Sequence, residues 1–465
     1  MTRDPRERAT LLEMSGNAAL AAARYDAAEH HMQAAADAFA ELHDRLSGAR
    51  VTAALGMMHT SHSRPLQGIA IIEPVLDAAR DLGDEPEVIT LMGSLARSYL
   101  FADDYDRALE LVDEVLVAAE RIDDVSIITE GVLTKGTTLL YSARYREGLV
   151  LLAGGLQLAE THGFVASQLR ARLNISFLQL PDDPRLARAT AIVGLDQARR
   201  LGNTAWSRLL AGNAANAQFV LGDWEALLAT YEQLLGDRTT YESDVAELAG
   251  LQLAIRATRV GIAAVGPEIE RFDVAVSDVS GSQERTVALQ IRIWLALTAG
   301  YDQELMSWPI ESVEPLNGLM CHHLAGHVAL WNGDVVRARA ALTGMIGTGL
   351  HGRWATAVRL DLEAGIAALD GHTAVSETNM SSAISSLREM DARLTLALAL
   401  MGRVRLTSDD NVADAAGLEA RSILADLGAR TLIDRLDRML AARPRSRLQE
   451  ASPAIAAAGD VPTRG

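Results

Sequence analysis

The residues most able to do chemistry lie in one short stretch, Cys321-His322-His323-Leu324-Ala325-Gly326-His327. His323 and His327 are four residues apart and would share one face of a helix, where two imidazoles can hold a metal ion. The zinc-protease pattern needs a glutamate directly after the first histidine, and Leu324 stands there instead. We therefore interpret these histidines as side chains that line a helix. The sequence indicates no catalytic residue, no metal and no cofactor.

Two further groups have suitable residue types without the spacing of a known site. His59 and His62 are three residues apart, in a stretch that is explained by the lining of a groove. Gly344, Gly347 and Gly349 form a glycine-rich run, but no lysine follows them and no strand is predicted before them. A nucleotide-binding loop is therefore not indicated, and we do not expect the chain to be an enzyme.

The use of lysine excludes one class of site directly. Of the 43 basic residues, 42 are arginines, and Lys135 is the only lysine. A phosphate-binding P-loop needs a glycine immediately before the lysine and a Ser or Thr after it. In this chain Gly136 follows Lys135 instead. The sequence therefore has no Walker A motif.

Composition and charge restrict the partners and the compartment. The 465 residues carry 61 acidic and 43 basic side chains, a net charge of −18, which argues against nucleic acid and anionic membranes as partners. The longest run without a charged residue, 315–333, contains three histidines and two asparagines, so no membrane span is expected there. The N-terminus lacks a signal-peptide pattern and the chain has one cysteine, which together favour a cytoplasmic location.

A repeat of about forty residues organises the chain. Short terminating segments recur with spacings of 40, 40, 39 and 40 residues, at 41–44, 81–84, 121–124, 160–163 and 200–203. Before each terminator, small and apolar residues step by four and three, which is the pattern of one face of an α-helix. In the first copy this stripe is Ala28, Met32, Ala35, Phe39 and Leu42.

Each of these helices is preceded by a turn and by a second helix. The turns include 24–26, 104–106, 144–146 and 222–224. The earlier helix carries a small residue twelve positions before the stripe in most copies, at Gly16, Gly56, Ala96, Gly136 and Ala215. The repeating unit is a helix–turn–helix hairpin. Hairpins in series predict an all-α fold, an α-solenoid of antiparallel helix hairpins.

We expect one helical-repeat solenoid over residues 1–442, with regular repeats over 8–240 and looser ones over 241–442. Between about 240 and 320, segments rich in Gly and Pro blur the register, which fits either shortened hairpins or a kink. At this period the solenoid has room for about ten or eleven hairpins. The Ala-, Gly- and Pro-rich segment 443–465 is predicted to be a disordered C-terminal tail.

The repeat resembles a known family. Gly16, Tyr25, Ala28 and Ala35 have the small–aromatic–small–small spacing of tetratricopeptide repeats. The long period is similar to the repeats behind the ATPase of maltose-regulator-type transcription activators and of multidomain class III adenylate/guanylate cyclases of bacteria. Residues 16–28 and 419–430 resemble the first and last repeats of such regions. This resemblance implies a bacterial signalling or regulatory protein, but carries over neither ATP hydrolysis nor cyclisation, because the chain shows no ATPase or cyclase domain.

Two functions from different classes remain open. The one we prefer is a non-catalytic scaffold that binds a protein or peptide partner in the concave groove of a tetratricopeptide-like superhelix. The alternative, which the resemblance supports, is a regulatory module that senses a small-molecule effector and acts with a separate ATPase, cyclase or transcription regulator. A neighbouring upstream reading frame that encodes a P-loop ATPase or a cyclase would favour the second function, and unrelated neighbours would favour the first.

The groove residues follow from the register. In such a superhelix the first helix of each hairpin lines the concave side, and a residue next to the packed small position is rotated by about 100° toward the groove. The predicted partner-binding residues are Asn17, Met57, Arg97, Thr137, Arg172, Ser176 and Asn216. The two arginines suit bidentate contacts with a carboxylate of the partner.

Overall fold

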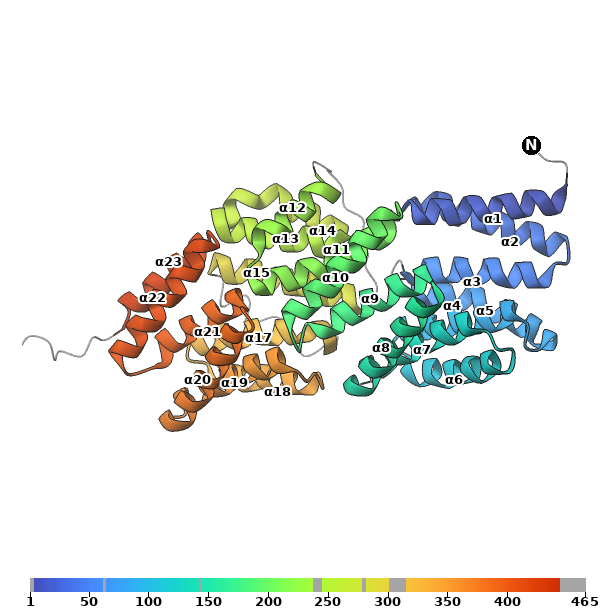
Figure 1. Ribbon diagram of the computed structural model, residues 1–465. Helices are drawn as coiled ribbons and strands as arrows, with labels where there is room; N and C mark the ends of the chain where they lie inside the picture. Colours follow the sequence, from blue (N-terminus) through green and yellow to red (C-terminus); the bar gives the residue numbers. More distant parts are fainter. Residues whose placement is uncertain are drawn as a thin grey trace, which may run out of the picture.

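The computed structural model describes residues 4–61, 64–142, 144–236, 245–277, 282–300 and 315–443. Within these ranges the chain forms 22 α-helices and two short 3₁₀ helices, and it forms no strand. Helices that follow one another in the sequence pack against one another throughout (Figure 1). The protein is therefore an all-α solenoid, as predicted.

The helices pair into hairpins in chain order. The first five pairs are α1 (Pro5–Ala21) with α2 (Tyr25–Glu41), α3 (Arg45–Ser61) with α4 (Pro65–Ala79), α5 (Pro86–Phe101) with α6 (Tyr105–Arg121), α7 (Val125–Tyr141) with α8 (Tyr145–His162), and α9 (Val165–Gln179) with α10 (Pro184–Arg200). Their lengths, 15 to 18 residues, are uniform.

The later pairs are less regular. They are α11 (Thr204–Leu221) with α12 (Trp224–Leu234), α13 (Ala246–Val260) with α14 (Gly266–Ala275), α17 (Pro315–Trp331) with α18 (Val335–Gly347), α19 (Arg353–Leu369) with α20 (Thr373–Glu389), and α21 (Arg393–Leu406) with α22 (Asp410–Asp426). Two further helices of the described chain are single: α15 (Ser282–Ala299) and α23 (Arg430–Ala441). Helix α14 has only ten residues, so a shortened hairpin occurs where the register blurred. Apart from Arg443, the predicted tail lies outside the described residues.

The terminators end the helices because one residue of each adopts a left-handed backbone conformation. The φ angle is positive at His43, Gly83, Asp123, Gly163 and Gly202. After Asp123 (φ 57°), the N–H of Asp124 bonds back to the carbonyl of Ala119, which closes α6. The Asp124 carboxylate then accepts from the N–H groups of Ser126 and Ile127 and starts α7. The regular spacing of these segments is thus the spacing of the hairpins.

Small residues bring the two helices of a hairpin into close contact. A Cβ atom on Gly148 of α8 would lie 2.5 Å from the carbonyl oxygen of Gly136 on α7 and 2.6 Å from Leu140 Cγ. A Cβ on Gly16 would lie 2.6 Å from Met32 Cγ of α2. Gly16 and Gly136 are two of the predicted small positions. At Gly148 the neighbour is backbone, so no side-chain movement makes room for a larger residue.

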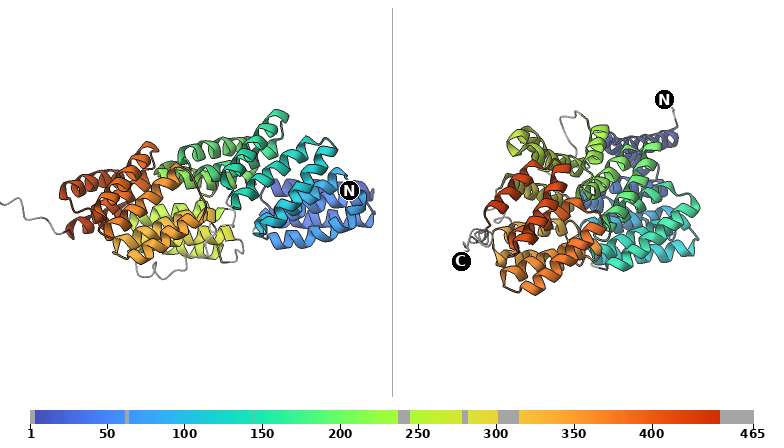
Figure 2. Two further views of the ribbon diagram at one scale, coloured as in Figure 1. Left: turned by 90° about the horizontal axis from the view of Figure 1, so that it is seen from below. Right: turned by 60° about the vertical axis from the view of Figure 1, so that its left-hand side comes forward.

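Successive turns of the superhelix touch at regular intervals. Helix α1 contacts α11, α11 contacts α21, and α13 contacts α23. The partners are ten helices apart for α1 and α11, and nine helices apart in the described part of the chain for the other two pairs, so about five hairpins complete one turn. We call α1–α10 the first turn and α11–α23 the second turn. Figures 1 and 2 show the two turns following one another along the long axis of the molecule.

The two turns differ in what fills their inner side. Helix α21 buries ten of its 14 residues and α13 buries 11 of its 15, whereas the inner helices α5 and α7 of the first turn bury nine of 16 and ten of 17. A helix that is buried on all sides lies inside the fold. Side chains also bond across the second turn: Arg259 donates to the carbonyl of Leu427, and Thr431 to that of Thr258. The second turn is therefore closed by its own helices.

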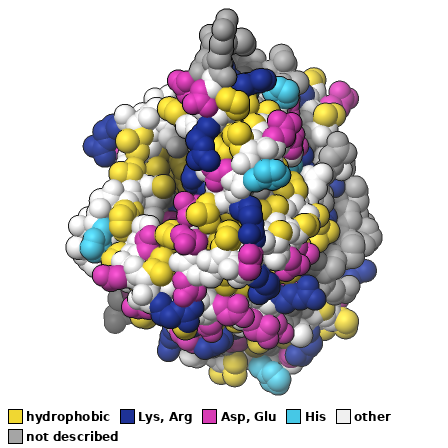
Figure 3. All heavy atoms as spheres, turned by 90° about the vertical axis from the view of Figure 1, so that its right-hand side faces the viewer, with side chains coloured by type: hydrophobic (Ala, Val, Ile, Leu, Met, Phe, Trp, Pro, Cys, Tyr) yellow, Lys and Arg dark blue, Asp and Glu magenta, His cyan; other side chains and the backbone are white. Residues whose placement is uncertain are grey.

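The surface of the first turn carries mixed charge. Figure 3, which looks at the N-terminal end of the molecule, shows acidic and basic side chains interspersed. Some of these pair between neighbouring hairpins, as Arg50 does with Glu13 (2.8 Å) and Arg121 with Asp84 (2.7 Å). Such exposed ion pairs contribute only tenths of a kcal/mol each to the free energy of unfolding. They therefore affect how neighbouring hairpins are aligned more than they affect the stability of the fold. Among the described residues, no helix has both the length and the apolar content for a bilayer crossing.

Two alanine substitutions in α8 test the close contact. Gly148→Ala should lower the free energy of unfolding by about 1–3 kcal/mol, because the new methyl group meets the backbone of α7. Gly154→Ala is the matched control: nothing lies within 4 Å of its Cβ position, so the better helix propensity of alanine should raise stability by roughly 0.5–1 kcal/mol. Urea denaturation measures both, and equal effects would contradict the packing described.

Candidate functional site

The first turn contains a hollow of about 400 Å³. Its walls come from the first helices α3, α5, α7 and α9, together with Val115 of α6 and the residues that join α8 to α9. The apolar part of the lining includes Met57, Ile89 and Ile127. The charged side chains in the lining are two arginines and one glutamate: Arg97, Arg170 and Glu130.

The forty-residue register explains why these side chains meet. Met57 and Arg97 are forty residues apart, and so are Thr90, Glu130 and Arg170. Residues at one repeat spacing occupy equivalent places on consecutive first helices, which lie side by side in a solenoid. The two series of residues lie seven positions apart, as Thr90 and Arg97 do on α5. Seven residues are about two helical turns, so both series lie on the same face of the first helices.

Within the hollow, Arg170 is neutralised by the protein itself. Its buried guanidinium pairs with the Glu130 carboxylate and donates to Thr134 Oγ1 at 2.7 Å and to the Glu130 carbonyl at 3.2 Å. Burial raises the pKa of Glu130, but the charge of Arg170 and a hydrogen bond with Ser167 outweigh it, so the pKa is lowered overall. Glu130 is thus ionised, and the charges of this pair cancel.

Arg97 is different because, in the described part of the chain, it has no ion-pair contact of its own and shares the single charge of Glu130 with Arg170. Among the described residues it forms no hydrogen bond or ion pair, and its guanidinium lies over the ring of Phe101, 5.9 Å from the centroid. Burial and the neighbouring Arg170 charge lower the pKa of Arg97 to about 9, so it remains charged at neutral pH. The hollow therefore carries a net charge of +1 in a strongly acidic protein. Its unsatisfied donors suit an anionic group.

The other predicted groove residues lie elsewhere. Asn17 is exposed on α1. Arg172 donates to Gln197 and Glu160 of the second helices α10 and α8. The remaining three bond to neighbouring first helices: Thr137 accepts from Asn174, Ser176 accepts from Asn213, and Asn216 donates to Glu247. A role of these residues in partner binding remains a prediction.

Sequence reasoning missed Arg170 and Glu130. The signal was present, since Glu130 lies seven positions before the predicted Thr137 and Arg170 lies forty residues after Glu130, in the same register. It was missed because only the position next to the packed glycine, and four residues before it, was followed along the chain. A face of a helix of 15 or 17 residues also continues to the positions seven earlier.

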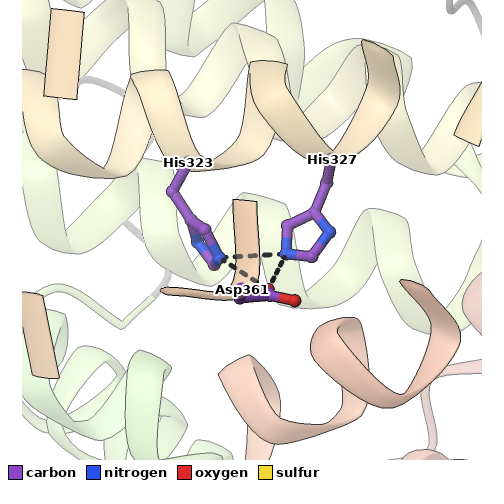
Figure 4. Close-up of side chains that lie close together, drawn as sticks. All are labelled: His323, His327 and Asp361. Atoms are coloured by element: carbon purple, nitrogen blue, oxygen red, sulfur yellow. Dashed lines mark hydrogen bonds and ion pairs between the residues drawn. The ribbon is translucent and has the colours of Figure 1, made fainter. Parts of the chain in front are cut away.

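A second cluster lies in the closed second turn. His323 and His327 of α17 and Asp361 of α19 point toward one another (Figure 4), and all three are buried. The two imidazole Nε2 atoms are 2.9 Å apart. Asp361 Oδ2 is 3.0 Å from Nε2 of His327 and 3.6 Å from Nε2 of His323. Three potential ligand atoms therefore converge on one point.

Close packing of α17 on α19 brings these side chains together. A Cβ on Gly326 would lie 2.6 Å from Leu362 Cδ1, and a Cβ on Gly365 would lie 2.3 Å from Leu330 Cδ1. The two glycines are 39 residues apart and occupy equivalent places in consecutive hairpins. Asp361 precedes Gly365 by one helical turn, which places its carboxylate beside the turn of α17 that holds His323 and His327.

No metal was predicted at the histidines because Leu324 stands where the zinc-protease pattern has a glutamate, and the pattern offered no third ligand nearby. Asp361 supplies that ligand from the next hairpin. Asp361 stands between Arg359 and Glu363, so nothing in the local sequence distinguishes it from the charged residues beside it. Burial lowers the pKa of His323 to about 4, and contacts with the two imidazoles outweigh burial to lower the pKa of Asp361 to about 2. At neutral pH the cluster holds a carboxylate beside a neutral His323.

Comparison with known proteins identifies no family. No family model matches the chain, and no curated protein matches it. Among the solved structures, the chain is similar to a "circular tandem repeat protein with novel repeat topology and enhanced subunit contact surfaces", with 12% sequence identity over 94% of this chain and 95% of that one. The TM-score of 0.16 is too low for that similarity to carry an argument about fold or function.

The two arginines of the hollow should respond differently to the same substitution. Arg170→Met should lower the free energy of unfolding by about 2–3 kcal/mol, because it leaves Glu130 without its buried partner. This loss is smaller than the loss expected for a fully buried ion pair, because Glu130 is partly exposed. Arg97→Met should change stability by less than about 0.5 kcal/mol or raise it, because no bond is lost. Denaturant titration of both variants would contradict the assignment if Arg97→Met proved the more damaging.

Proposed function

We propose that the protein is a non-catalytic, tetratricopeptide-like scaffold that binds an acidic segment of a protein partner in the hollow of its first turn. The observation that carries this proposal is Arg97, a half-buried guanidinium with no partner among the described residues. No nitrogen of this guanidinium is buried without a partner, so its N–H groups are open to solvent and free to donate to a ligand. A carboxylate of the partner would accept from them through a bidentate contact.

The rest of the lining supports an extended segment of chain. Ser94 and Thr90 of α5 and Ser126 of α7 offer hydroxyl groups for backbone amides, and Met57 and Ile127 offer apolar surface. Glu130, next to Arg97, would repel a second acidic group and so set the register of the bound segment. The remaining predicted residues, such as the exposed Asn17, would extend the contact along the first helices.

The biological setting of the proposal rests on the resemblance of the repeats. Residues of the tetratricopeptide pattern, Gly16, Tyr25, Ala28 and Ala35, occur in repeats as long as those of bacterial multidomain ATPase regulators and cyclases. A cytoplasmic role in bacterial signalling or transcriptional regulation follows from that resemblance. Neither nucleic acid nor membrane is expected as the partner, given the net charge of −18.

One observation favours an alternative, the sensing of a small effector for a separately encoded ATPase, cyclase or transcription regulator. The volume of the hollow, about 400 Å³, falls in the range of small-molecule sites, roughly 300–1,000 Å³. Under this alternative the ligand is a small anion, such as a carboxylic acid with an apolar tail against Met57 and Ile89. Titration with short acidic peptides and with small carboxylates, followed by calorimetry, distinguishes the two.

A charge reversal in the hollow tests both versions. Arg97→Glu should reduce binding of an acidic peptide by at least about tenfold, since it replaces an attraction with a repulsion. Arg146→Glu, at an exposed arginine of the outer helix α8, is the matched control and should leave binding unchanged. Helical circular dichroism should be the same for both variants. Equal losses from the two reversals would show that net charge, not the hollow, governs binding.

A further inference from the structure

We propose that His323, His327 and Asp361 form a binding site for a divalent transition metal ion of the Zn²⁺ type, which joins α17 to α19 in the second turn. This site is separate from the hollow and does not depend on the function proposed for it. The three side chains are at most 1% exposed.

The distances between the donor atoms fit such an ion. Two imidazole nitrogens and a carboxylate oxygen bound tetrahedrally at about 2.0–2.1 Å lie about 3.3 Å from one another. The observed separations, 2.9, 3.0 and 3.6 Å, bracket that value. Only small side-chain movements are needed to centre an ion among the three atoms.

Hydrogen bonding among the three groups leaves the cluster incompletely satisfied. The Nε2–H of one imidazole donates to the lone pair on Nε2 of the other. Asp361 Oδ2 is a buried oxygen that lies 3.0 Å from Nε2 of His327, in a contact that lacks hydrogen-bond geometry. Buried polar groups in this state are rare and costly. A divalent cation would use both nitrogen lone pairs and neutralise the carboxylate.

The binding of the ion has its own cost. Coordination through Nε2 places the proton of each ring on Nδ1, and both Nδ1 atoms are buried without a partner. The attraction between a dication and a buried carboxylate must outweigh that cost. In a low-dielectric interior such an attraction is large.

The donor set indicates the class of metal. Imidazole nitrogen favours Zn²⁺, Fe²⁺, Co²⁺ and similar ions, and disfavours Mg²⁺ and Ca²⁺, which take oxygen ligands. Two histidines and one carboxylate leave at least one position open on a four-coordinate ion. Gly402 of α21 lies beside the cluster and puts no side chain there; a Cβ on it would be 3.9 Å from His327 Cε1.

Metal binding by untagged, full-length protein tests the site. After treatment with a chelator and addition of Zn²⁺, Co²⁺ or Mg²⁺, the wild-type protein should retain about one equivalent of Zn²⁺ or Co²⁺ and no Mg²⁺, measured by mass spectrometry of the metal. Bound Co²⁺ should show the visible absorption of a site with two imidazole ligands. Zn²⁺ should also raise the melting temperature, because it binds only the folded chain.

Substitutions at the cluster and beside it complete the test. Asp361→Asn and His327→Gln, which keep the size of the side chains, should weaken Zn²⁺ binding by roughly 100-fold or more. His322→Gln is the control on the same helix, because this ring packs against Gly344 and not in the cluster. A folded wild-type protein that retains less than a tenth of an equivalent of every ion would overturn the proposal. So would Zn²⁺ binding that survives Asp361→Asn and His327→Gln, or that His322→Gln abolishes equally.

Discussion

The fold depends on close contact between helices at a few small residues in a fixed register. At Gly136 and Gly148 two helix backbones come so near that a single methyl group would clash with a carbonyl oxygen. Close contacts also occur between hairpins, where a Cβ on Gly131 of α7 would lie 2.8 Å from Leu116 Cδ2 of α6, so each hairpin is placed on the previous one by local packing. Five such steps bring α11 back over α1. The superhelix, its pitch and its two turns all follow from this local packing.

The same packing produces two different interiors. In the first turn the inner helices leave a hollow with a net positive charge, in which Arg97 has no partner among the described residues. In the second turn the last helices, α21 and α23, pack onto α11 and α13 and fill the inner side. Polar residues of the inner helices therefore line an open hollow in one turn and are enclosed by other helices in the other. The cluster of His323, His327 and Asp361 lies inside that turn, where α17 packs on α19 of the next hairpin.

The sequence predicted most of the fold because its repeat is local and periodic. Terminators such as 121–124 carry their own backbone signal, and the stripe from Ala28 to Phe39 is buried as expected. The sites were harder to predict. Arg170 meets Glu130 from forty residues away, and Asp361 meets His327 from the next hairpin. Such pairs depend on how neighbouring hairpins are placed, and on closure between turns, neither of which a pattern within one helix contains.

The central claim is that the inner side is open in the first turn and closed in the second, and cysteine labelling tests it most directly. The only native cysteine, Cys321, is buried, so a new cysteine can be followed against a low background. Thr90 of α5 is exposed at the hollow, and Thr395 of α21 is 2% exposed. A maleimide should label the folded Thr90→Cys variant at the rate of a free thiol. The Thr395→Cys variant should react only after denaturation. Rapid labelling at 395 in the folded protein, or protection at 90, would contradict the account.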